Sequence, residues 1–153
     1  MRIVFKLPWQ VTVIAVMLSG CGSYEDETVV FTTVLSTDVQ QLIDNGYLEG
    51  GLEPVGEQWQ DFYFAETPGM LDSLFWEYPP VLDSLFPEGG SLLILHLETD
   101  VEDEILGYSM EASSDTVRIS VEIRDRDVSD PYPGIHEWVF PVGVVLEPET
   151  PAE

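Results

Sequence analysis

The sequence predicts an α+β domain, with a mainly antiparallel sheet and with one amphipathic helix and short helical turns packed on one face. Residues 92–95 are all Leu or Ile, which is typical of a strand buried on both faces. Residues 116–124 alternate between apolar and polar side chains, which is typical of a strand with one solvated face. Residues 56–66 instead carry aromatic side chains at three- and four-residue spacing, which predicts a helix.

The first part of the domain is predicted to begin with a strand. Residues 29–35 are β-branched and aromatic, as strands prefer. Residues 37–44 fit either a short capped helix or an alternating strand, and the sequence does not separate the two. The pairs Asn45-Gly46 and Gly50-Gly51 predict loops after it.

A helix of about three turns is predicted for residues 56–66, ended by Pro68-Gly69. Its aromatic stripe, formed by Trp59, Phe62 and Tyr63, is interpreted as core.

A short repeat follows this segment. The residues Leu-Asp-Ser-Leu-Phe occur at 71–75 and again at 82–86, on either side of a Tyr-Pro-Pro sequence. Two copies are too few for a solenoid. They predict two short helical turns that place Leu and Phe on the core.

The remaining chain reads as consecutive strands. The segment 91–97 is expected at the centre of the sheet, followed by strands at residues 105–112, 116–124 and 138–146. Pro141 cannot donate a backbone hydrogen bond, which predicts an edge or a bulge at that point.

The amino terminus resembles a bacterial lipoprotein leader. Arg2 and Lys6 form a positive region, and residues 11–18 are apolar but too few to span a bilayer. The sequence Leu18-Ser19-Gly20-Cys21 matches the lipobox of bacterial lipoproteins, in which the cysteine receives diacylglycerol and the peptidase cuts before it. The resemblance implies a signal peptide at 1–20 and a lipidated Cys21.

The predicted organisation follows from that cleavage. It comprises the signal peptide, an acidic tether at 21–28, a single domain at 29–146 and a disordered acidic tail at 147–153. The resemblance implies a place in the cell envelope. Gly22 is not the Asp that retains enterobacterial lipoproteins in the inner membrane, so an outer-membrane location is favoured, at the periplasmic face or the cell surface.

Charge excludes one class of partner. Without Arg2 and Lys6 the chain keeps three basic residues against 29 acidic ones, a formal charge of 3 − 29 = −26. Nucleic-acid binding is therefore excluded, and the acyl anchor alone is expected to hold the protein to the membrane. The acidic surface indicates either adaptation to a saline habitat or an ordinary acidic secreted protein, and charge alone does not choose between them.

The sequence has no nucleophile elbow, no P-loop and no paired cysteines. His96 and His136 have no recognisable zinc-ligand spacing. Enzymatic use of these histidines would require at least two of His96, His136, Asp100 and Asp127 to converge on one pocket.

Two acidic runs offer oxygen ligands for Ca²⁺. Asp125, Asp127 and Asp130 follow a strand, and residues 100–104 form a second acidic turn. The first run lacks the glycine and the distal Glu of an EF-hand loop, so solvated turn charges are the favoured interpretation, and no cofactor is predicted.

The order of features in residues 55–146 resembles the PrcB-like domain of protease-complex accessory lipoproteins. The resemblance rests on the aromatic segment around Trp59, the apolar strand, the alternating strand and a Pro-Tyr sequence before the last strand. Gly107 and Tyr108 correspond to the family's Gly-Gly-Tyr turn. The resemblance implies binding and stabilisation of a partner protein, without catalysis.

Taken together, these features predict a lipid-anchored envelope protein whose acidic domain is a non-catalytic interaction module with an unidentified protein partner. Two alternatives remain open. One is a metal-dependent or hydrolytic envelope enzyme, and the other is a lipoprotein that binds Ca²⁺ or a small molecule.

Overall fold

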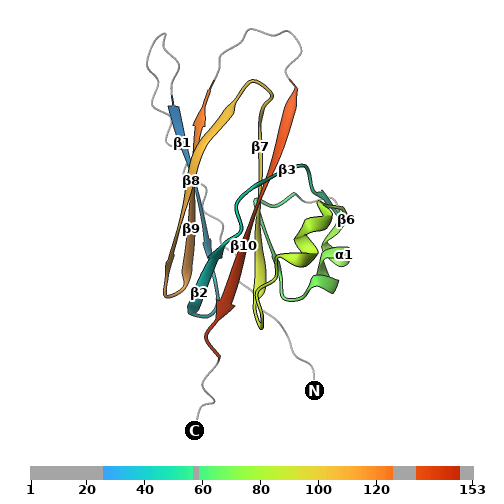
Figure 1. The fold of residues 1–153 in the computed structure, drawn as a ribbon, viewed down its shortest axis with the longest axis vertical. Helices are drawn as coiled ribbons and strands as arrows, with labels where there is room; N and C mark the ends of the chain where they lie inside the picture. Colours follow the sequence, from blue (N-terminus) through green and yellow to red (C-terminus); the bar gives the residue numbers. More distant parts are fainter. Residues whose placement is uncertain (1–25, 57–58, 126–133, 149–153) are drawn as a thin grey trace.

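A computed structural model describes residues 26–56, 59–125 and 134–148, which form two facing β-sheets with short helical turns on one side (Figure 1). The strands are β1 (Asp26–Val34), β2 (Val39–Asp44), β3 (Leu48–Glu49), β4 (Glu53–Pro54), β5 (Phe62–Ala65), β6 (Phe75–Glu77), β7 (Ser91–Asp100), β8 (Glu104–Ser113), β9 (Thr116–Arg124) and β10 (Ile135–Leu146). The helical turns are η1 (Pro68–Met70), α1 (Leu71–Leu74) and η2 (Pro80–Ser84).

The two main sheets are antiparallel. The smaller sheet has the strand order β1-β9-β8, and the larger one has the order β2-β10-β7-β5, with β3 also paired to β10. Strands β4 and β6 form a separate two-stranded ribbon. The chain therefore crosses from the larger sheet to the smaller one after β7 and returns before β10.

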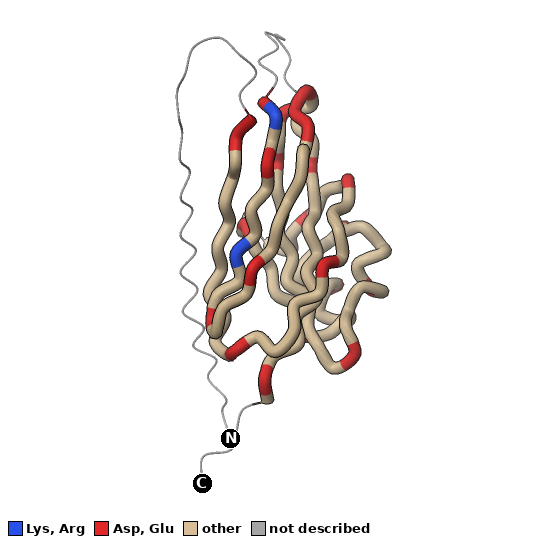
Figure 2. The backbone as a smooth tube through the Cα atoms, turned by 60° about the vertical axis from the view of Figure 1, so that its left-hand side comes forward, with Lys and Arg blue, Asp and Glu red and all other residues tan. Residues whose placement is uncertain are grey.

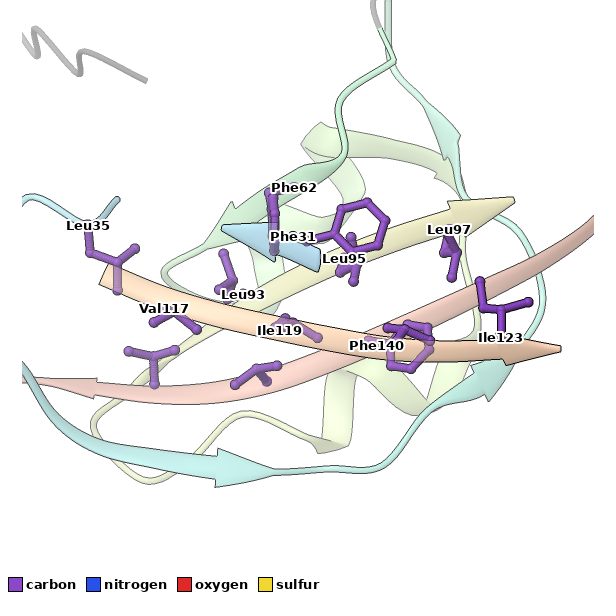
Figure 3. Packing of buried hydrophobic residues seen from close by; sticks show 13 residues of the cluster. Phe31, Leu35, Phe62, Leu93, Leu95, Leu97, Val117, Ile119, Ile123 and Phe140 are labelled. Atoms are coloured by element: carbon purple, nitrogen blue, oxygen red, sulfur yellow. The ribbon is translucent and has the colours of Figure 1, made fainter. Parts of the chain in front are cut away.

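The main core lies between the two sheets (Figure 3). One face of β9 contributes Val117, Ile119, Val121 and Ile123, as its alternating sequence predicts, and all four side chains are buried. The rings of Phe31 on β1 and Phe62 on β5 meet edge to face across this core, with centroids 6.2 Å apart, so the aromatic side chains link the sheets.

A second core lies on the other face of the larger sheet. Strand β7 turns Leu93, Leu95 and Leu97 toward the smaller sheet, and it turns Leu92 and Ile94 toward the helical turns. The predicted burial of this strand on both faces is confirmed. The helical turns cover the outer face with fully buried Leu71 and Leu82.

The predicted α+β class is wrong, because the protein is mainly β. Strands hold 59% of the described residues, and among those residues the helical structure is limited to the short turns η1, α1 and η2. Two facing sheets form the main core, where the sequence analysis expected one sheet and a helix.

The prediction of an amphipathic helix at 56–66 is wrong, because residues 59–61 are not helical and the short strand β5 follows them. Phe62 and Tyr63 are both buried because β5 has a core on each face, so neighbouring residues are apolar and the strand loses its period of two. Together with Trp59, Phe62 and Tyr63 have the three- and four-residue spacing that is typical of a helix, although they lie in a loop and a strand. Pro68 begins η1 rather than ending a helix, a position that proline tolerates well.

The structure also gives the outcome of several predictions about single segments. Residues 39–44 are a strand, which resolves the helix-or-strand ambiguity, and β1 begins at Asp26, inside the predicted tether. Both copies of the repeat form the expected helical turns. Pro141 lies in an inner strand, but the neighbouring ladder is interrupted there, since β2 pairs with β10 from Val142 onward and β3 pairs at Trp138 and Val139.

Acidic residues are spread over the strands and the connecting loops, as Figure 2 shows in red. Among the described residues the basic side chains are Arg118 and Arg124, both on β9. Within the same part of the chain, none of the helices has the length and apolar character that a membrane crossing requires.

Candidate functional site

A histidine and two glutamates gather on the outer face of the larger sheet. His96 and Glu98 lie two residues apart on β7, and Glu137 of β10 is the direct cross-strand partner of Glu98. Side chains two residues apart on a strand, and directly opposed side chains, share one face. One imidazole nitrogen and one oxygen from each carboxylate consequently lie within 4.8 Å of one another.

His96 is buried without a hydrogen-bonding partner for one ring nitrogen. Its side chain is 5% exposed, and Nε2 lies 3.4 Å from Oε1 of Glu137. That separation is compatible with an ion pair, but Nε2 makes no hydrogen bond with any described residue. The two groups are close but not aligned for a hydrogen bond, and hydrogen bonds weaken steeply with poor alignment. An unsatisfied buried polar group costs about 1–3 kcal/mol.

Two neighbours shape this cluster. The indole of Trp59 stacks on the His96 ring, with centroids 5.1 Å apart and an interplanar angle of 27°. The Glu137 carboxylate lies directly against Gly51, where a Cβ atom would overlap both of its oxygens. Gly51 thus leaves the space in which the carboxylate lies.

An acidic groove of about 660 Å³ begins beside the cluster, a size typical of ligand sites. It is lined by Glu49, Gly50, Gly51, Leu52, Glu53, Trp59, Glu77, Tyr78, Pro79, Pro80 and Glu137. None of these residues is basic. Trp59 also lines a smaller hollow with His96 and Glu98, so its indole lies between the two.

Two glutamates of the groove oppose each other directly. Glu53 of β4 is the cross-strand partner of Glu77 in β6, and both are exposed. Like charges directly opposed on a sheet are destabilising. The groove therefore holds a pair of negative charges that a bound cation would stabilise.

Tyr78 joins the groove to the repeat. Its hydroxyl donates to Oδ1 of Asp72 at 3.1 Å and lies 3.4 Å from Oδ1 of Asp83, the corresponding aspartate of the second copy. Partial burial, the hydrogen bond to Asp72 and the two negative charges raise the pKa of Tyr78 to about 12. The phenol stays neutral at physiological pH.

His136 lies away from His96. On β10 it is next to Glu137 and so projects from the opposite face, where its ring stacks on Trp138 with centroids 4.4 Å apart. Its Nε2 lies 2.9 Å from Oε1 of Glu49. The structure does not bring the two histidines together.

The acidic residues singled out from the sequence have other surroundings. Asp100 donates its backbone N–H to Oδ2 of Asp103 at 3.1 Å, which closes the turn after β7. Asp125 directly follows β9, whereas Asp127 and Asp130 lie outside the described residues. Two of the three candidate Ca²⁺ ligands in this run thus lie outside the part of the chain that the structure describes. The lipobox residues Leu18, Ser19, Gly20 and Cys21 also lie outside the described residues.

Gly107 and Tyr108 lie within strand β8. A register shift between Ile105 and Gly107 makes Leu106 the extra residue of a β-bulge. The Tyr108 hydroxyl donates to Oδ1 of Asp44 at 2.8 Å. Partial burial, this hydrogen bond and the charge of Asp44 raise the pKa of Tyr108 to about 12.

Sequence patterns did not identify Glu98, Glu137 and Gly51 as parts of one site. A signal for the first was present, because the sequence His96-x-Glu98 inside a strand places both side chains on one face. Glu137 could not be added from the sequence, since it requires the register between β7 and β10.

Fold and site together define a class of protein, a mainly-β, two-sheet domain with an acidic groove beside a histidine–carboxylate cluster. The chain matches no family model, no curated protein and no solved structure. The resemblances to bacterial lipoproteins and to the PrcB-like domain therefore remain predictions from the sequence.

Proposed function

We propose that this protein is a lipid-anchored component of a bacterial envelope, held at the outer membrane through Cys21, whose acidic domain binds a partner protein without catalysis. The groove is the proposed binding surface, and a lysine- or arginine-rich segment of the partner is the proposed ligand.

The observation that carries the proposal is the direct opposition of Glu53 and Glu77 in a groove without basic residues. A cationic side chain between the two carboxylates would remove their repulsion and gain two charge-assisted hydrogen bonds. The unbound groove is thus less favourable electrostatically than the occupied one.

Aromatic and proline side chains supply the rest of the recognition surface. Trp59 is 55% exposed at one end of the groove, where an indole can take part in a cation–π contact with a lysine or arginine. Pro79 and Pro80 form a wall that loses little entropy on binding, because proline is already restricted. This combination favours a basic polypeptide over a free inorganic cation.

The arrangement of charge also favours protein over nucleic acid. The two arginines in the described part of the chain lie on β9 of the smaller sheet, away from the groove. Phosphate groups would meet carboxylates there, which opposes binding.

The test is binding of a fluorescently labelled lysine-rich peptide to the full-length chain at physiological ionic strength. The double variant Glu53→Gln/Glu77→Gln should weaken binding about tenfold, because each exposed charge contributes up to ~1 kcal/mol. The anisotropy of the peptide measures the affinity.

A matched control separates the groove from general attraction to an acidic protein. Glu66→Gln/Glu88→Gln changes the net charge equally, and both residues are exposed and outside the groove. Its affinity should stay within about twofold of the parent. Equal weakening by the two double variants would contradict the proposal.

The anchor is tested separately by mass spectrometry of protein purified from bacterial membranes. A mature chain that starts at an acylated Cys21 is expected, and Cys21→Ser should abolish both lipidation and cleavage. An unmodified chain that begins at Met1 would remove the envelope assignment.

A further inference from the structure

We propose that His96, Glu98 and Glu137 bind one divalent transition-metal ion, for which Zn²⁺ is the best match. The metal site does not require the proposed function, because His96 and Glu98 lie outside the acidic groove, although Glu137 lines the groove and also belongs to the cluster. It rests on the positions of three side chains and on the unpartnered imidazole nitrogen.

The three ligand atoms are already close to coordination distance. Zinc binds histidine nitrogen and carboxylate oxygen at about 2.0–2.2 Å, so tetrahedral ligands lie roughly 3.4 Å apart. The atoms here lie within 4.8 Å of one another, and Nε2 of His96 is already 3.4 Å from Oε1 of Glu137. Small side-chain rotations complete the site, because Glu98 is exposed and Glu137 is partly exposed.

The buried nitrogen is the independent sign of a ligand. Buried polar groups almost always have a hydrogen-bonding partner, and Nε2 of His96 has none among the described residues. An N–H on Nε2 would point toward Glu137, but the alignment of the two groups does not make that hydrogen bond. With the ring proton on Nδ1, Nε2 instead offers its lone pair to a metal, and two carboxylates beside it balance the charge of the ion.

The donor set selects the kind of metal. One nitrogen and two oxygens suit zinc and its neighbours in the transition series, whereas Ca²⁺ and Mg²⁺ prefer oxygen ligands throughout. Three protein ligands leave a coordination position for water, as in zinc sites that are not purely structural.

Two neighbours hold the ligands in place. Trp59 stacks on the His96 ring and limits its rotation. Gly51 provides the space that the Glu137 carboxylate occupies, and any larger residue there would push the carboxylate away. We regard Gly51 as a positioning residue for the metal site.

The test is a Zn²⁺ titration of the full-length chain after chelator treatment, followed by competition with a chromophoric chelator. Millimolar Ca²⁺ is included to occupy weak sites on the acidic surface. One tight zinc ion per chain is expected. His96→Gln and Glu98→Gln should each weaken it at least about tenfold.

Further variants distinguish the site from other sources of zinc binding. His136→Gln is the matched control, because it removes the other histidine–carboxylate pair on the opposite face of β10, and it should leave the affinity unchanged. Gly51→Ala should weaken zinc while the melting temperature of the metal-free protein stays the same, since a Cβ there meets the end of a flexible side chain.

Either of two results would overturn the inference. One is the absence of a tight zinc ion in the parent protein, and the other is a tight ion that survives both His96→Gln and Glu98→Gln. Glu98→Gln should also leave binding of the lysine-rich peptide unchanged, so failure of the metal site can be told apart from failure of the groove.

Discussion

Tyr108 shows how a single side chain connects the two sheets. Its hydroxyl donates to Asp44 in β2, and its ring meets Phe140 in β10 edge to face with centroids 5.6 Å apart. Asp44 also accepts a hydrogen bond from the backbone N–H of Gly46 at 2.8 Å, where the positive φ of 74° suits glycine. One carboxylate thus fixes both the turn after β2 and the tyrosine of the facing sheet.

The raised pKa of Tyr108 predicts a loss of stability in alkaline solution. The pKa rises from 10.0 to about 12 on folding. Between these values the unfolded chain has released the phenolic proton and the folded chain has kept it, so stability is complete below pH 10 and falls as the pH approaches 12. Tyr108→Phe should reduce this fall, as measured by urea unfolding from pH 8 to pH 11.5.

Tyr78 provides the internal check for this prediction, because its pKa is also raised to about 12. The double variant Tyr78→Phe/Tyr108→Phe should show less alkaline destabilisation than either single variant. An alkaline fall that is the same in the parent and in the double variant would show that other groups cause it.

At the scale of single residues, the sequence predicted which side chains of β9 are buried, but it did not predict which side chains meet in one cluster. The alternation around β9 identified its buried residues, but it could not show that His96 would lack a partner. The surroundings of His96 include Glu137, which is 41 residues away in the chain. Only the register between β7 and β10 places the two side chains next to each other. Trp59 was assigned to the core but is 55% exposed, because its segment is a loop and not a helix.

At the scale of elements, the repeat forms two equivalent helical turns. Ser73 donates to the Met70 carbonyl and Ser84 donates to the Val81 carbonyl, each at 2.7 Å. The first leucine of each copy, Leu71 or Leu82, is completely buried. The serine hydrogen bond and the buried first leucine are therefore the same in both copies, although the first copy is an α-helical turn that leads into β6 and the second lies in a 3-10 turn.

This equivalence predicts equal energetic roles for the two buried leucines. Leu71→Ala and Leu82→Ala should each lower the free energy of unfolding by about 2–5 kcal/mol, because each leaves a cavity in the outer core. The second leucines, Leu74 and Leu85, are partly exposed and serve as matched controls, with clearly smaller losses. Urea unfolding measures all four variants, and equal losses at the buried and partly exposed positions would contradict the equivalence.

The strands were the elements most readily predicted. Strands β7, β8, β9 and β10 follow from apolar runs and alternation, since each long strand keeps one pattern over many residues. Strand β5 was missed because a four-residue strand buried on both faces has no alternation to detect. Aromatic residues favour strands, and the edge of β7 provides a partner for this one.

At the scale of the whole molecule, the division into two sheets was not predictable from local pattern. Strands β7 to β10 are consecutive in the chain, but β9 pairs with β8 and β1, while β10 pairs with β7 and β2. Local sequence does not encode these long-range pairings. Arg124 on β9 reinforces the smaller sheet, lying 3.4 Å from Asp26 of β1 and 3.2 Å from Glu104 of β8.

The charge of the whole molecule predicts that salt stabilises it. The chain carries a formal charge of −24, and the two arginines of its described part lie on one strand. Repulsion between carboxylates therefore dominates the long-range electrostatics of the folded protein. The Debye length falls from about 10 Å at 0.1 M salt to 3 Å at 1 M, which removes this repulsion from the folded state. The melting temperature should rise by at least about 4 °C over that range, corresponding to ~1 kcal/mol.

The triple variant Glu66→Gln/Glu88→Gln/Glu122→Gln, which changes exposed residues only, should melt higher at 0.1 M and gain less from salt. An equal gain in the parent and the variant would assign the effect to general salting-out, and no gain in the parent would contradict adaptation to a saline habitat.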